Sequence, residues 1–238
     1  MATIILVVLL IGGTSAAFAY TQRLKTERSP LGVPRFDRKL APTCDCPSAE
    51  AKLRLRLREA DRVSAEIVDA DDAVVRMLAD DEPKPMGPLV FTWDGRDEAG
   101  RVVDDGVYRL RVSLADADRT ILYPTTIHVD TIAPRLELVS VRPTELAPGG
   151  ERRLKVTYRS NEEARPILTA AAEGESPQVV NRGRYWPRGQ ASVNWAGLKD
   201  GEPVPPGPYV LTLRVEDRFG NQSDPVSAPV TILEGPSG

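Results

Sequence analysis

A pattern of glycines, one tryptophan and one tyrosine occurs twice in this chain and limits its fold more than any other feature. Residues 87–112 and 189–213 both read Gly, five residues, Trp, one residue, Gly, three or four residues, Gly, five residues, Gly, one residue and Tyr. The matched positions are Gly87, Trp93, Gly95, Gly100, Gly106 and Tyr108 in the first copy and Gly189, Trp195, Gly197, Gly201, Gly207 and Tyr209 in the second. Repetition at a fixed period indicates two copies of one folding unit.

Each copy is predicted to form a β-hairpin. The segments that end at Trp93 and begin at Tyr108 alternate in polarity and are rich in β-branched and aromatic residues, which is typical of strands with one buried face. The glycines between them supply positive φ where the backbone turns. We expect Trp93 and Tyr108 to lie on the same side of a paired ladder. We expect Trp195 and Tyr209 to form the hairpin core of the second copy in the same way.

The repeat extends upstream of these segments at an offset of 101 residues. The aligned pairs are Leu53–Leu57 with Leu154–Tyr158, Pro42 with Pro143, Pro47 with Pro148, and Phe36 with Glu137. A unit of roughly a hundred residues with short strands and Pro/Gly turns has the size of an immunoglobulin-like sandwich. We therefore predict an all-β chain with two tandem Ig-like β-sandwich domains, at residues 35–133 and 134–235.

The first copy also resembles a known family. Residues 91–101, FTWDGRDEAGR, followed by Asp-Gly-Val-Tyr at residues 105–108, are similar to the Ig-like domain of bacterial flagellar hook-capping proteins, the FlgD type. The second copy has Ala196 where the first has Asp94, and it resembles a degenerate member. The resemblance implies the fold of a module found in secreted and surface proteins. It does not imply the hook-capping role, because fold and function are not tied in this way.

The N-terminus holds the one strongly apolar run of the chain, residues 3–19, which closes on Ala-Phe-Ala before Tyr20. Residues 1–20 are therefore either a secretory signal peptide with an A-x-A cleavage site or an uncleaved membrane anchor helix. Basic residues follow the run and none precedes it, which opposes the usual charge bias for export. We nevertheless expect an extracytoplasmic chain, membrane-anchored or secreted, with residues 21–34 as a tether.

No motif in the sequence predicts catalysis, a metal site or a cofactor. His128 is the single histidine, and no nucleophile-elbow pattern accompanies it. The acidic residues between Asp94 and Asp105 do not have the spacing of an EF-hand loop, and their turns explain them. The net charge of −3 gives no reason to expect nucleic acid as a partner.

The only two cysteines, Cys44 and Cys46, are separated by one residue. In an exported protein we expect them to be oxidised, since thiols there are not held reduced. The alternatives are a local disulfide that staples the loop, a bridge to another chain, or a metal or thiol-redox site, which would need further ligands.

Arginines alternate with apolar residues in two predicted strands of the first domain. Strand periodicity puts the apolar residues in the core and the arginines on outer faces. The arginines are either a solvated face that discourages edge pairing or a contact surface for anionic lipid headgroups or a cell-wall polyanion. The candidate contact residues are Arg54, Arg56, Arg58, Arg109 and Arg111.

Tyr185 and Trp186 lie between two arginines in a segment whose counterpart in the first copy has no aromatic residue. Two adjacent rings beside arginines form either a cap over one end of the sandwich or a contact site for a partner protein or a sugar.

These features together predict a non-enzymatic, exported, envelope-associated structural or interaction protein that presents two Ig-like modules. Its partners would be the membrane, through residues 3–19 if they are uncleaved, and an envelope protein or a cell-wall polymer. The alternative is an extracytoplasmic metal-binding or thiol-redox accessory protein that uses Cys44 and Cys46.

Overall fold

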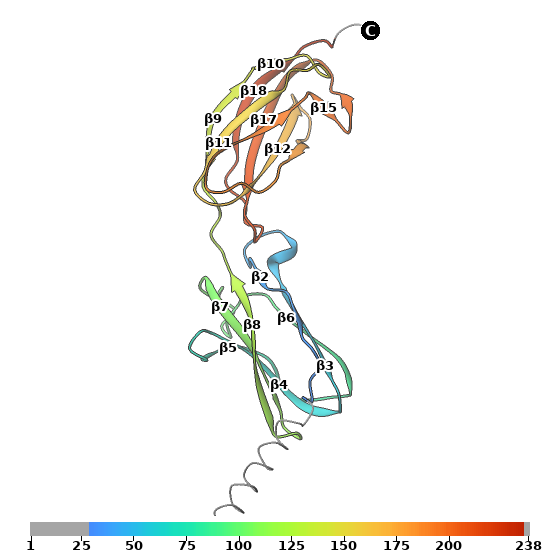
Figure 1. Ribbon diagram of the computed structural model, residues 1–238, viewed down its shortest axis with the longest axis vertical. Helices are drawn as coiled ribbons and strands as arrows, with labels where there is room; N and C mark the ends of the chain where they lie inside the picture. Colours follow the sequence, from blue (N-terminus) through green and yellow to red (C-terminus); the bar gives the residue numbers. More distant parts are fainter. Residues whose placement is uncertain (1–28, 236–238) are drawn as a thin grey trace, which may run out of the picture.

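The computed structural model describes residues 29–235, and these fold into two β-sandwiches that lie end to end along the long axis (Figure 1). The predicted all-β fold with two sandwiches is confirmed. The predicted signal or anchor at residues 1–20 lies outside the described residues. Within residues 29–235 the one helix is a single 3-10 turn, η1 (Pro47–Ala49), and no helix is long and apolar enough to cross a membrane.

The first sandwich packs a three-stranded sheet, in the order β1-β3-β6, against a five-stranded sheet, in the order β2-β8-β7-β4-β5. β2 runs parallel to β8, and the other described pairs are antiparallel. The strands are β1 (Arg35–Phe36), β2 (Lys39–Leu40), β3 (Ala51–Leu57), β4 (Asp61–Val68), β5 (Val74–Lys84), β6 (Gly87–Trp93), β7 (Gly106–Leu114) and β8 (Arg119–Val129).

The second sandwich repeats this topology strand for strand. Its sheets have the orders β14-β11-β9 and β10-β18-β17-β12-β13, with β10 parallel to β18, and a small ribbon joins β15 to β16. The strands are β9 (Leu136–Arg142), β10 (Glu145–Leu146), β11 (Leu154–Ser160), β12 (Arg165–Ala172), β13 (Gln178–Arg182), β14 (Gly189–Trp195), β15 (Leu198–Lys199), β16 (Glu202–Pro203), β17 (Gly207–Glu216) and β18 (Val226–Ile232).

The predicted hairpin is wrong in both copies. β6 pairs with β3, whereas β7 pairs with β4 and β8, so the glycine-rich segment crosses from one sheet to the other. Trp93 and Tyr108 therefore meet across the core from opposite sheets, with ring centroids 5.1 Å apart, and Trp195 meets Tyr209 at 6.0 Å. All four rings are buried. Alternating polarity shows which face of a strand is buried, and it does not reveal which strand lies beside it.

The repeated Trp-x-Gly spacing has a local cause. The indole N–H of Trp93 donates a hydrogen bond to the carbonyl oxygen of Arg96 at 3.0 Å, and Trp195 donates to Leu198 at 2.9 Å. The chain turns back between donor and acceptor at Gly95, where φ is +72° and a β-carbon would lie 2.8 Å from the ring of Pro42. Glycine allows both the positive φ and the close approach to Pro42, because it has no β-carbon.

The alignment at an offset of 101 residues is also wrong for the strands. Ala51 pairs with Trp93, and Leu154 pairs with Trp195, so these strands are equivalent at an offset of 103 residues. The two-residue shift left the predicted buried face unchanged, because side chains alternate with a period of two.

The tether predicted for residues 21–34 overlaps the first sandwich at its end. Leu31 is 3% exposed in the first core and bridges to Leu57. Gly32 N–H donates to the carbonyl oxygen of Arg56, and Arg58 N–H donates to that of Pro30. The first sandwich thus includes the chain from Pro30 onward.

Candidate functional site

Two loops in which the repeats differ meet where the sandwiches join. The loop between β2 and β3, residues 41–50, has ten residues against seven in the second sandwich. The loop between β17 and β18, residues 217–225, has nine residues against four in the first. We call them the cysteine loop and the docking loop. Each sandwich has therefore lengthened the loop that faces the other, and this junction is the candidate site.

Asp217 organises the docking loop. Its side chain is buried, and its Oδ1 accepts hydrogen bonds from the N–H groups of Phe219, Gly220 and Asn221 at 2.7, 2.7 and 2.9 Å. Its Oδ2 accepts a fourth from Nδ2 of Asn221 at 2.9 Å. A buried carboxylate with this many donors fixes the loop in one conformation.

The docking loop is bonded directly to the first sandwich. Nδ2 of Asn221 donates to the carbonyl oxygen of Asp130 at 3.1 Å. From the other side, Nζ of Lys39 donates to the carbonyl oxygen of Arg218 at 2.9 Å and lies 5.6 Å from the ring centroid of Phe219. Both hydrogen bonds join a side chain of one sandwich to a backbone carbonyl of the other. They therefore fix the position of the docking-loop backbone relative to the first sandwich.

The linker between the sandwiches is hydrogen-bonded along its length. Oδ1 of Asp105 accepts from both the N–H and the hydroxyl of Thr131, at 2.7 and 2.8 Å. Ile132 N–H donates to Oδ1 of Asp130, and Arg135 N–H donates to Oδ1 of Asn161. The linker is thus tied to both sandwiches.

The cysteine loop carries a disulfide between Cys44 and Cys46, with Cα atoms 5.3 Å apart. Sγ of Cys46 lies 3.8 Å from the carbonyl oxygen of Phe219. A β-carbon on Gly220, whose φ is +106°, would lie 2.6 Å from the same sulfur. Only glycine lets the docking loop approach the disulfide this closely.

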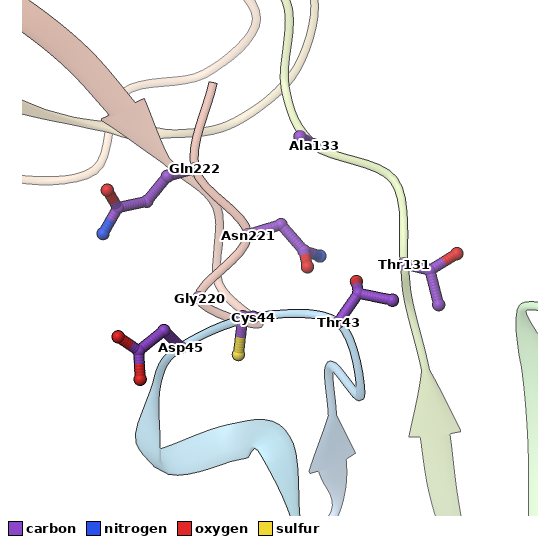
Figure 2. Close-up of a pocket in the computed structure, with 8 residues that line it drawn as sticks. All are labelled: Thr43, Cys44, Asp45, Thr131, Ala133, Gly220, Asn221 and Gln222. Carbon is purple, nitrogen blue, oxygen red and sulfur yellow. The ribbon is translucent and has the colours of Figure 1, made fainter. Parts of the chain in front are cut away.

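A cavity of about 410 Å³ opens beside the disulfide, between the cysteine loop, the linker and the docking loop (Figure 2). Its lining is mainly polar and consists of Thr43, Cys44, Asp45, Thr131, Ala133, Gly220, Asn221 and Gln222. Figure 2 shows Gly220 and Asn221 of the docking loop next to Thr43 and Cys44 of the cysteine loop, with Thr131 and Ala133 of the linker beside them.

Three carboxyl groups, those of Asp105, Asp130 and Glu162, line a second cavity at the junction together with Phe219. Burial raises the pKa of Asp130, and the charges of Asp217 and Asp105 raise it further, against the hydrogen bond from Ile132. Burial also raises the pKa of Glu162, with smaller effects of the same sign from Asp217 and Asp130. The junction therefore holds like charges close together at neutral pH.

Comparison with known proteins identifies the first sandwich. Residues 47–118 match the family model described as the FlgD Ig-like domain. The first sandwich contains a FlgD-type Ig-like domain. The matched residues run from η1 to the turn after β7, so they include the repeated tryptophan and tyrosine.

Solved structures similar to this chain include fibronectin(III)-like modules of CbhA from Clostridium thermocellum. The identity is 16%, over 85% of this chain and 95% of that one, and the TM-score is 0.47. The D0-D1 domain of intimin shares 12% identity over 83% of this chain and 97% of that one, with a TM-score of 0.30. Scores this low support no functional inference. The curated proteins gave no match.

The five predicted arginines do not share one face of the FlgD-type domain. Arg54, Arg56 and Arg58 belong to β3 or follow it in the three-stranded sheet. Arg109 and Arg111 lie on β7 in the opposite sheet. There they form ion pairs with Asp72 at 2.7 Å and Glu66 at 2.6 Å. A single face of five arginines is therefore wrong, and only the β3 group remains a candidate for anionic contact.

Tyr185 and Trp186 make internal contacts at the end of the second sandwich that faces the first. The hydroxyl of Tyr185 donates to the carbonyl oxygen of Asp217 at 3.0 Å, and Arg218 lies 4.7 Å from its ring centroid. The ring of Trp186 lies 4.1 Å beneath the guanidinium of Arg184. Both side chains are half-buried. Tyr185 thus supports the docking loop, and contact with a partner or sugar stays a prediction.

The alternative of a metal site at Cys44 and Cys46 receives no support from the described residues. Within residues 29–235 no group of three His, Cys, Asp or Glu side chains is arranged to hold a metal ion. The acidic residues of the first repeat serve local structure instead. Oδ1 of Asp97 accepts from the N–H groups of Ala99 and Arg101, both at 2.9 Å, and Asp105 holds the linker.

Sequence reasoning missed the junction residues Lys39, Asp217, Gly220 and Asn221. One signal was available in the unequal lengths of the equivalent loops. A second was the run Asp217-Arg-Phe-Gly-Asn221, whose residue types favour a tight side-chain-capped turn.

Proposed function

We propose that this protein is a non-enzymatic, exported, envelope-associated structural protein that holds two Ig-like modules as a spacer of fixed geometry. The observation that carries the proposal is the junction. Asn221 and Lys39 each join one sandwich to a backbone carbonyl of the other, at 3.1 and 2.9 Å. Sandwiches joined by a linker alone would keep their relative motion.

Several features support this proposal against an enzyme. Ig-like modules are typically non-catalytic, and function must be argued from a site and not from the fold. The polar side chains of the junction form hydrogen bonds with other groups of the same chain. The donors of Asn221 and the acceptors of Asp217 are all engaged in this way. The apolar run at residues 3–19 supports export and attachment to the membrane.

The location is tested by fractionating the native host, treating intact cells with protease and sequencing the fragments that remain. We expect a membrane-bound N-terminal fragment and both sandwiches digested from outside. Sandwiches that stay protected until the cells are opened would contradict the proposal.

The fixed geometry is tested with pulsed electron paramagnetic resonance on the full chain. Spin labels on Leu122→Cys in the first sandwich and Ser227→Cys in the second report the distance across the junction. A pair within the second sandwich, Gln190→Cys and Ser227→Cys, sets the width caused by the labels alone. We expect equal widths, and a much broader distribution across the junction would rule out a fixed spacer.

A further inference from the structure

The three-stranded sheet of the first sandwich carries a basic outer face. Strand alternation buries the leucines of β3 and exposes Lys52, Arg54 and Arg56 between them. Arg58 continues the row, and Arg35 of β1 pairs with Arg54 across the ladder. All five are exposed, and together we call them the basic face.

The charge of the basic face is almost unopposed. Arg54 forms a loose ion pair with Asp37 at 3.4 Å, and both side chains are 46% exposed. Arg35, Arg56 and Arg58 make no ion pair with any residue in the range 29–235. The remainder of residues 29–133 is acidic, because the whole segment holds 15 Lys and Arg against 20 Asp and Glu. The first sandwich is thus strongly polarised.

The basic face also exposes an apolar side chain. Val90 of β6 pairs with Arg54 and is 58% exposed. A mixture of cations and apolar side chains suits the boundary between headgroups and acyl chains better than it suits bulk water.

The path of the chain places this face near the predicted anchor. Pro30 and Leu31 are joined to the end of β3 that carries Arg58. Residues 20–29 separate the apolar run from this point, and ten extended residues span at most about 35 Å. With the run in a bilayer, the headgroups lie within reach of the basic face.

We propose that the basic face binds a membrane surface rich in anionic phospholipids. Guanidinium groups donate paired hydrogen bonds to phosphate oxygens, and a negatively charged leaflet attracts clustered cations. The first sandwich then lies with its three-stranded sheet against the bilayer. This inference rests on the export and anchoring of the proposed function.

The test uses the full chain in phosphatidylcholine vesicles with and without phosphatidylglycerol, at low salt. An environment-sensitive dye on Thr92→Cys reports contact of the basic face with lipid, and a dye on Leu122→Cys reports the opposite sheet. We expect the emission of the first dye to rise only with phosphatidylglycerol and to fall as salt screens the contact.

The triple variant Arg54→Ser, Arg56→Ser, Arg58→Ser should lose this signal. Each cation near an anionic surface strengthens binding several-fold. With three cations removed, the ratio of lipid-bound to unbound basic face should fall roughly 100-fold. The matched control is Lys155→Ser, Arg159→Ser, Arg188→Ser in the second sandwich. It removes the same charge and should leave the signal unchanged.

Flotation of the vesicles separates the two proposals. A chain that floats with neutral vesicles but shows no change in dye emission with phosphatidylglycerol is anchored, and only the basic-face inference is overturned. A chain that floats with neither kind of vesicle overturns both. Equal losses in the triple variant and its control would reduce the effect to net charge and also overturn the inference.

Discussion

The side-chain amide of Asn221 donates one hydrogen bond to Asp217 in its own loop and another to the backbone carbonyl oxygen of Asp130 in the other sandwich. Asn221 is 4% exposed, so water cannot replace either bond. One side chain therefore links the conformation of the docking loop to the position of the first sandwich.

Replacement of Asn221 by Ala should loosen this junction. The change leaves the half-buried carbonyl oxygen of Asp130 and the buried carboxylate of Asp217 each short of a donor, which costs about 1–3 kcal/mol. Denaturant unfolding measures the loss, and the spin-label distance across the junction should broaden. Asn181→Ala, which removes a side-chain bond to the carbonyl oxygen of Asn194 away from the junction, is the control. Equal effects of the two changes would contradict a special role for Asn221.

Gly220→Ala should separate the docking loop from the disulfide. The new methyl group would lie 2.6 Å from Sγ of Cys46, at a φ of +106°. Strain of this kind costs about 1–3 kcal/mol. Gly174→Ala provides the comparison, because its φ is +79° and nothing lies within 4 Å of the new atom. We expect a loss of about 1 kcal/mol there. A distance distribution in Gly220→Ala as narrow as in the parent would contradict the close packing.

Acid should stabilise the junction through Glu162. Its pKa is raised in the folded protein, chiefly by burial, so folding favours the protonated form. This contribution is present below the pKa of the unfolded chain and is lost as pH rises through the folded value. Glu162→Gln should therefore raise the melting temperature at pH 7, and the difference should vanish in acid.

The neighbouring Glu163 should behave oppositely. The hydrogen bond from Arg218 lowers its pKa, so its contribution is present above the unfolded pKa and is lost in acid. Glu163→Gln should not stabilise the protein at pH 7. Melting curves of both variants at pH 4 and pH 7 test the pair. If both variants raised the melting temperature at pH 7, or both lowered it, the opposite pKa shifts of Glu162 and Glu163 would be refuted.

The sequence was sufficient to predict the sandwiches but not the pairing of their strands. Alternation in Leu53, Leu55 and Leu57 identified the buried face of β3, and the repeated tryptophan identified the two units. The glycine-rich segment between Trp93 and Tyr108 suits a hairpin and a crossing between sheets equally well. Only the position of β3 and β4 beside these strands decides between them.

The contacts at the junction could not be predicted from the sequence for a different reason. Asn221 and Asp130 lie 91 residues apart in the chain, and their contact depends on how two complete sandwiches are oriented. Cys46 and Tyr185 were recognisable as unusual, yet their contacts with Phe219 and Asp217 of the docking loop were not. These contacts join residues far apart in the chain, which no local pattern encodes.

Tyr158 offers a test of the second core. Its hydroxyl is buried and has no hydrogen-bond partner in the described part of the chain, and burial raises its pKa to about 12. Tyr158→Phe removes this unmet group and keeps the ring, so stability should stay the same or rise by about 1 kcal/mol. Tyr108→Phe is the matched change in the first core, where the hydroxyl donates to the carbonyl oxygen of Asp104 at 2.8 Å. We expect it to lose about 1 kcal/mol. Denaturant unfolding compares the two variants, and a larger loss at Tyr158 than at Tyr108 would show that the buried hydroxyl is satisfied in solution.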